Sequence, residues 1–81
     1  MTVSVSFFGH QRSLIGIDCI KVELTPKSRV VDILRYMQHH YPNLRLSEKN
    51  VVIAVNDQVC SLEQPLKADD NVSFLPHIGG G

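Results

Sequence analysis

Hydrophobic and polar residues alternate in two segments near the N-terminus. Residues 2–8 read TVSVSFF, in which the apolar side chains up to Phe7 share one face and Phe8 falls on the opposite face. Residues 18–25 read DCIKVELT and alternate in the same way. Because a period of two is typical of half-buried strands, these segments predict an N-terminal hairpin. Residues 9–16 between them, GHQRSLIG, begin and end with glycine and are expected to form a connecting loop.

A helical pattern follows the second predicted strand. Pro26 ends that strand, and Ser28 is a candidate helix N-cap. The next apolar positions have the spacing i, i+3, i+4, i+7 and i+11: Val30, Ile33, Leu34, Met37 and Tyr41. This stripe predicts one helix of about three turns that buries its apolar side against a sheet and ends at Pro42.

Three further strands are expected in the second half of the chain. Residues 51–56, VVIAVN, are rich in β-branched residues and predict a central strand that is largely covered on both faces. Residues 58–62 predict a short return strand, and residues 72–76 predict the last one. The order β-β-α-β-β-β indicates an α+β roll with a mixed sheet of about five strands on one main helix. If the last strand pairs beside the first, Phe8 and Leu75 share the uncovered face of the sheet.

The charges of the chain balance. Eight Lys and Arg residues match eight Asp and Glu residues, so the formal net charge is zero and no basic stripe indicates nucleic-acid binding. The apolar runs are too short to cross a bilayer, and the N-terminus lacks the features of a secretory signal. We therefore expect a cytoplasmic protein that binds neither nucleic acid nor membranes.

The sequence contains no recognisable catalytic or metal-binding motif. It has no glycine-rich nucleotide loop and no nucleophile spacing, and the adjacent His39 and His40 would point about 100° apart on a helix. Cys19 and Cys60 are not in a CxxC arrangement, so we expect two small buried hydrophobic residues, with a disulfide between them as the alternative. No metal ion or cofactor bound by this chain is expected.

Two stretches resemble the MoaD/ThiS family of sulfur carriers, and within it the molybdopterin synthase branch. Residues 5–16, VSFFGHQRSLIG, resemble the opening strand of the family with its paired aromatics, its arginine and the glycine that follows. Residues 54–81 resemble its AVN turn, its PL segment before an acidic turn, and a final strand that runs through proline into a diglycine end. The resemblance implies one β-grasp (ubiquitin-like) domain over residues 1–81, with residues 76–81 an extended, flexible tail.

The resemblance also implies a function that needs no catalytic residue on this chain. The C-terminal carboxylate of Gly81 would be adenylated by a separate activating enzyme that uses ATP, and a sulfur donor would convert it to a thiocarboxylate. That group would then give its sulfur to a molybdopterin precursor on the large subunit of molybdopterin synthase. The chain would be a non-catalytic carrier subunit.

The composition of the tail suits entry into the active site of another protein. Gly79 and Gly80 lack a Cβ, so this backbone would fit a narrow channel, and Pro76 would stiffen the exit from the domain. An extended run from Pro76 to Gly81 would reach roughly 20 Å. Ordering glycines on docking costs entropy, so we expect Phe8 and Leu75 to supply an apolar partner surface.

Three alternatives to this function stay open. The chain could serve a thiamine-type pathway or another pathway that uses the same kind of sulfur carrier. It could instead be a ubiquitin-like modifier that is joined to lysines of target proteins through Gly81. The third alternative is a passive binding module in which the glycine end has no role.

Overall fold

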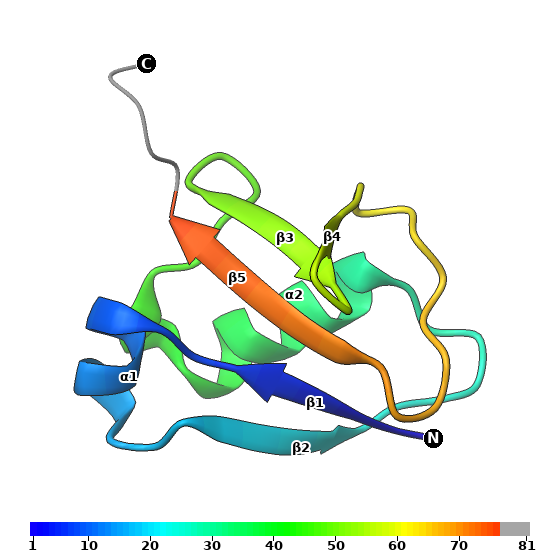
Figure 1. Cartoon of the computed structure of the whole chain (residues 1–81), viewed down its shortest axis with the longest axis horizontal. Helices are drawn as coiled ribbons and strands as arrows, with labels where there is room; N and C mark the ends of the chain where they lie inside the picture. The colour runs from blue at the N-terminus through cyan, green and yellow to red at the C-terminus, as the bar shows by residue number, and fades with distance from the viewer. Residues whose placement is uncertain (77–81) are drawn as a thin grey trace.

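The fold is one mixed sheet packed on helix α2. This computed structural model describes residues 1–76. Figure 1 shows the elements in chain order. The strands of this part of the chain are β1 (Thr2–Ser6), β2 (Cys19–Glu23), β3 (Val51–Val55), β4 (Gln58–Val59) and β5 (Asn71–Pro76). Its helices are α1 (Gly9–Ile15), α2 (Val30–His40) and the short 3₁₀ helix η1 (Pro42–Leu44).

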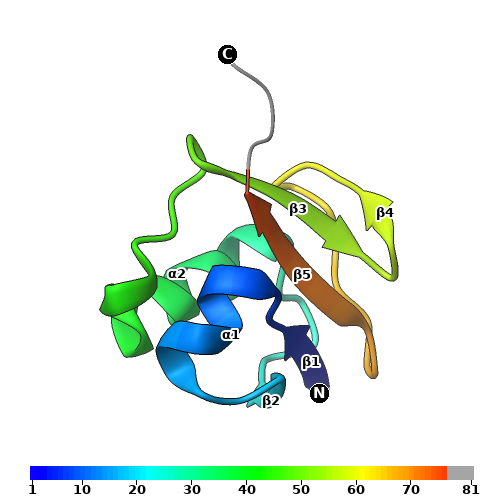
Figure 2. The same cartoon turned by 60° about the vertical axis from the view of Figure 1, so that its left-hand side comes forward.

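The five strands lie in the order β2-β1-β5-β3-β4. The central pair, β1 and β5, is parallel, with Val5 opposite Val72, and every other pair is antiparallel. Helix α2 covers one face of this sheet, as both views show (Figure 1, Figure 2). The prediction of an α+β, β-grasp roll with the last strand beside the first is therefore confirmed.

The core lies between the sheet and α2. Each strand turns alternate side chains toward the helix, so Val3 and Phe74 are fully buried. Four residues of the predicted helical stripe are the buried residues of α2: Val30, Ile33, Leu34 and Met37. The fifth, Tyr41, is the C-cap of the helix and is half-buried. Burying these apolar side chains is the main favourable term that holds the helix on the sheet.

The expected loop at residues 9–16 is wrong, because this segment forms helix α1. Gly16 ends the helix with φ +75°, and its N–H donates to the carbonyl oxygen of Arg12 at 2.8 Å. This is an ordinary role for glycine at a helix C-terminus. None of the residues of α1 is buried, so the segment lacks the apolar stripe by which a core helix is recognised.

Two smaller predictions also need correction. The N-cap of α2 is Arg29 rather than Ser28, and the backbone N–H of Arg29 donates to Asp32 Oδ2 at 2.8 Å. Ser28 is instead buried, with its hydroxyl 3.0 Å from that of Thr25. The strand at residues 51–55 is largely covered on both faces as predicted, since four of its five residues are buried, but the middle strand of the sheet is β5.

The expectation that both cysteines are buried is wrong. Cys19 is exposed, and Cys60 is half-buried; both are free thiols. Cys19 is exposed because of its place in the sheet. It is the first residue of the edge strand β2 and lies opposite Ser6. The residues on either side of Ser6 point into the core, so Ser6 and Cys19 point away from it. None of the helices in residues 1–76 is long and apolar enough to cross a membrane.

Candidate functional site

The strand that leads to the predicted tail is fixed in the middle of the sheet. β5 runs to Pro76, which lies opposite Val51 in the antiparallel pair with β3. The predicted roles of Gly79, Gly80 and Gly81 fall outside the described residues and stay predictions. What the structure does give is the place at which the chain leaves the sheet, next to the first residue of β3.

Phe8 extends the in-and-out alternation of β1 beyond the end of the strand. Phe7 is 2% exposed and lies in the core, whereas Phe8 is 50% exposed. The backbone at Phe8 is still extended (φ −129°, ψ 151°), and helix α1 begins at the next residue. The side chain of Phe8 is therefore a large apolar group presented to solvent, as the alternating pattern predicts.

Phe8 and Leu75 lie at the same end of the sheet. The last pair of the β1–β5 ladder is Ser6 with Ser73, and because the strands are parallel, Phe8 and Leu75 each lie two residues beyond it. Leu75 is half-buried and faces away from α2, since the neighbouring Phe74 is in the core. The structure thus brings the two predicted partner-surface residues to the end at which β5 finishes.

Phe8 is also one wall of a groove that the sequence did not reveal. We call it the Phe8 groove; its volume is about 300 Å³, and its described lining consists of Phe8, Gly9, His10, Gln11, Leu44, Leu46, Asn50 and Val51. Helix α1 supplies one side, and η1 with the segment before β3 supplies the other; Figure 2 shows these two helices at the same end of the molecule. Leu75 is not among the described residues that line it.

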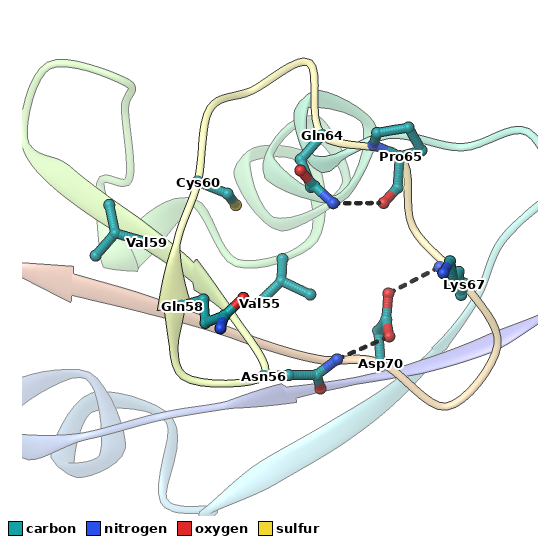
Figure 3. Close-up of a pocket in the computed structure, with 9 residues that line it drawn as sticks. All are labelled: Val55, Asn56, Gln58, Val59, Cys60, Gln64, Pro65, Lys67 and Asp70. Carbon is teal, nitrogen blue, oxygen red and sulfur yellow. Dashed lines mark hydrogen bonds between the residues drawn. The ribbon is translucent and has the colours of Figure 1, made fainter.

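A second pocket, at the other end of β3, is a structural feature with paired polar groups (Figure 3). Asn56 Nδ2 donates to Asp70 Oδ1 at 2.9 Å, and the backbone N–H of Lys67 donates to Asp70 Oδ2 at 2.8 Å. These bonds join the β3–β4 turn to the loop before β5. Asn56 has φ +51°, a conformation that asparagine tolerates in tight turns.

Cys60 lines this second pocket without the character of an activated nucleophile. Burial raises the pKa of the Cys60 thiol above its ordinary value, and a hydrogen bond with the Val55 backbone only partly opposes the shift. A thiol with a raised pKa stays protonated near neutral pH, and the thiolate is the nucleophilic form. Cys60 therefore lacks the lowered pKa by which a reactive cysteine is recognised.

The histidines of α2 do not assemble a metal site. His39 and His40 are exposed, and their rings meet edge to face with centroids 4.9 Å apart. The ring of His40 lies against Tyr36 instead, at 4.1 Å between centroids. Among residues 1–76, no three side chains of the types His, Cys, Asp or Glu come together in a way that could hold a metal ion.

The chain matches a known protein family and is similar in sequence to named members of it. The family model described as the ThiS family matches residues 5–81. The molybdopterin synthase sulfur carrier subunit of Escherichia coli is 32% identical over 84 residues, which cover 98% of this chain and 99% of that protein.

Two solved structures extend the comparison. SAMP1 from Haloferax volcanii has a TM-score of 0.83 and 17% identity with full coverage of both chains, a likeness that concerns the fold alone. A chain in the complex of subunits 1 and 2 of the molybdopterin-converting factor from Helicobacter pylori has a TM-score of 0.68 and 29% identity, again over the whole of both chains. The family match over nearly the entire sequence and the E. coli relative show that this chain belongs to the MoaD/ThiS family.

Proposed function

We propose that this protein carries sulfur for molybdopterin synthesis on the C-terminal carboxylate of Gly81. The family match extends through residue 81, and the E. coli relative bears the name of a molybdopterin synthase sulfur carrier subunit. The carboxylate attacks the α-phosphate of ATP in the activating enzyme, forming an acyl-adenylate and releasing pyrophosphate. A donor of sulfide-level sulfur then displaces AMP and leaves a thiocarboxylate.

The observation that carries this proposal is the position at which β5 leaves the sheet. Pro76 is paired with Val51, so the tail begins at a fixed point of the sheet. Phe8 and Leu75 lie at that same end. A partner that binds these two side chains is therefore well placed to accept the glycines that follow.

Catalysis belongs to the partners in this account. The large synthase subunit takes sulfur from the thiocarboxylate, and the activating enzyme supplies the ATP chemistry, so this chain needs no cofactor of its own. The structure of the H. pylori complex, in which a similar chain is found with a second subunit, supports a two-subunit synthase. The glycines suit the task because a chain without Cβ atoms passes through a narrow channel.

Two changes at the tail test this function. One residue appended after Gly81 blocks the carboxylate that is to be activated, and Gly80→Val adds bulk within the channel. Both variants should keep the wild-type melting temperature yet lose sulfur transfer in a reconstituted assay with the large subunit, the activating enzyme, ATP and a sulfur donor. Retained transfer in the extended protein would exclude Gly81 as the carrier site.

The same reconstituted assay distinguishes a sulfur carrier from a protein modifier. A modifier would use the adenylate to form isopeptide bonds, which appear as covalent ladders and as a Gly-Gly remnant on target lysines. A carrier for a different pathway would form the thiocarboxylate but would not support molybdopterin formation with the large subunit. A passive binding module would keep its partner binding after deletion of Gly80 and Gly81.

A further inference from the structure

Strand β2 is an open edge of the sheet. It pairs with β1 on one side, and no other helix or strand of residues 1–76 lies beside its backbone. Figure 1 shows β2 along the lower border of the sheet, with no strand beyond it. The opposite edge is formed by β4, which has only two residues, whereas β2 has five. An edge of this length is a template on which another strand can pair.

The hydrogen bonds of β2 show which of its backbone groups are free. The N–H of Leu24 donates to the carbonyl oxygen of Met1 at 2.7 Å, and the N–H of Phe7 donates to that of Asp18 at 2.8 Å. Since bonding alternates along an antiparallel pair, the even-numbered residues of β2 bond to β1. The residues that turn their N–H and C=O groups toward the open edge are therefore Cys19, Lys21 and Glu23.

The side chains along this edge carry opposite charges. Lys21 is exposed and makes no ion pair with any described residue. Glu23 lies two residues further on the same outer face, and its Oε1 is 3.2 Å from the amino group of Met1. A lysine on an edge strand ordinarily discourages pairing with another strand. It favours pairing when the incoming strand places a carboxylate opposite it.

A second copy of β2 can provide that carboxylate in one antiparallel register. Only registers that set odd-numbered residues opposite each other form hydrogen bonds, and those with Lys21 opposite Lys21, or Glu23 opposite Glu23, bring like charges together. The register between these two places Lys21 of each copy opposite Glu23 of the other. It also sets Val22 on the two-fold axis and the half-buried Ile20 opposite the half-buried Leu24, on the face that carries the core.

We propose that two copies of this chain form a symmetric dimer through β2, with Lys21 of each copy opposite Glu23 of the other. The two sheets then become one continuous sheet, held by main-chain hydrogen bonds and two opposite-charge pairs. One short strand per copy makes a small interface, so the dimer belongs to the weak, transient class.

This dimer leaves both C-terminal tails accessible. The two-fold axis makes β2 of one copy antiparallel to β2 of the other, so the two β5 strands also run in opposite directions. The two Pro76 residues, where the tails begin, therefore lie at opposite ends of the joined sheet. The inference goes beyond the proposed function and does not depend on it, because pairing through β2 involves no sulfur chemistry.

Charge reversal tests the pairing. Sedimentation velocity at low salt, from about 5 μM to about 500 μM, should show a monomer that becomes a dimer. Lys21→Glu and Glu23→Lys should each weaken the dimer at least about tenfold, whereas an equimolar mixture of the two variants, or the double variant, should dimerise within about threefold of wild type. Lys49→Glu, the same charge change at an exposed residue before β3, is the matched control and should dimerise like wild type.

A disulfide tests the register independently of charge, and it remains informative if Glu23→Lys does not fold. The proposed register sets Cys19 opposite Thr25 of the second copy, at about 5.5 Å between Cα atoms, which a disulfide can bridge. Thr25→Cys in a Cys60→Ser background should therefore give a covalent dimer on oxidation, with Cys19 joined to residue 25 by peptide mapping. The two Cys19 residues would lie roughly 20 Å apart, so Cys60→Ser alone should stay uncrosslinked.

Four results would overturn the inference. A protein that stays monomeric up to about 500 μM would show that β2 does not pair. A dimer that withstands both charge reversals would use another surface. A disulfide between the two Cys19 residues would mean a different register. Species larger than a dimer would contradict a closed two-fold pairing.

Discussion

Val51 lies directly opposite Pro76 in the antiparallel pair of β3 and β5. Val51 is 7% exposed, so this pair anchors the last described residue of the chain to the core. A group that must reach into the active site of another protein is best presented from a rigid element, because a loose base would add to the entropy lost on docking.

Phe8→Ala should weaken binding of the large subunit about tenfold or more while lowering the free energy of unfolding by less than about 1 kcal/mol. The reason is that Phe8 is 50% exposed in the free domain. Phe7→Ala is the matched control: Phe7 is 2% exposed, and its loss should cost about 3–5 kcal/mol of stability. Urea unfolding and calorimetry measure the two quantities. A larger stability loss for Phe8→Ala than for Phe7→Ala would reverse the assignment of faces.

Gly16→Ala should lower the free energy of unfolding by about 1–2 kcal/mol. A Cβ at this position would meet nothing within 4 Å, so the cost comes from the backbone, which has φ +75°. Gly16→Asn should cost less, because asparagine tolerates this conformation at a helix end. The measurement is urea unfolding of the three proteins. If both variants are as stable as wild type, helix α1 does not end at Gly16 as described.

Glu23 should contribute stability that disappears in acid. A hydrogen bond from Thr2 Oγ1, assisted by the charge of the Met1 amino group, holds the pKa of Glu23 below its ordinary value of 4.5. A carboxylate with a lowered folded-state pKa stabilises the protein above its unfolded-state pKa, and this contribution is lost as the pH falls through the folded-state value. Glu23→Gln should therefore melt below wild type at neutral pH.

The difference in melting temperature between wild type and Glu23→Gln should stay constant down to about pH 5 and close as the pH falls below 4.5. Thermal melts over that interval provide the measurement. Glu63→Gln, which removes an exposed ion pair with Arg29, is the control. A difference that widens in acid would contradict the lowered pKa of Glu23.

Cys60 should react with iodoacetamide more slowly than Cys19 in the folded protein at about pH 8. Cys19 is exposed, whereas Cys60 is half-buried and its pKa is raised by burial, which leaves less of the reactive thiolate. Peptide mass mapping over time measures both rates. In denaturant the two rates should become similar. Equal rates in the native protein would show that the Cys60 thiol is not protected.

The strands and the main helix could be predicted because each of them buries the side chains of one face in the core. Val3 and Val5 in β1, and Ile33 and Met37 in α2, are buried at the spacing of their element, so the pattern in the sequence is the pattern of burial. Helix α1 escaped prediction for the same reason, since it buries no residue and has no such pattern. The exposure of Cys19 depends on which strand is at the edge, which local sequence does not determine.

Some features of the candidate site could be predicted from the sequence, and others could not. The exposure of Phe8 follows from alternation, and its position near the end of β5 follows from parallel pairing with β1, so both could be predicted. The Phe8 groove could not, because it forms where residues 8–11 meet residues 44–51, which are far apart in the chain.

The intact mass of the wild-type protein after incubation with the activating enzyme, ATP and a sulfur donor tests the central claim most directly. The account predicts a gain of about 16 Da that maps to the C-terminal peptide, as expected when one carboxylate oxygen is exchanged for sulfur. Sulfur transfer to the large subunit without that gain, or a mass change that maps to Cys19 or Cys60 instead, would contradict it.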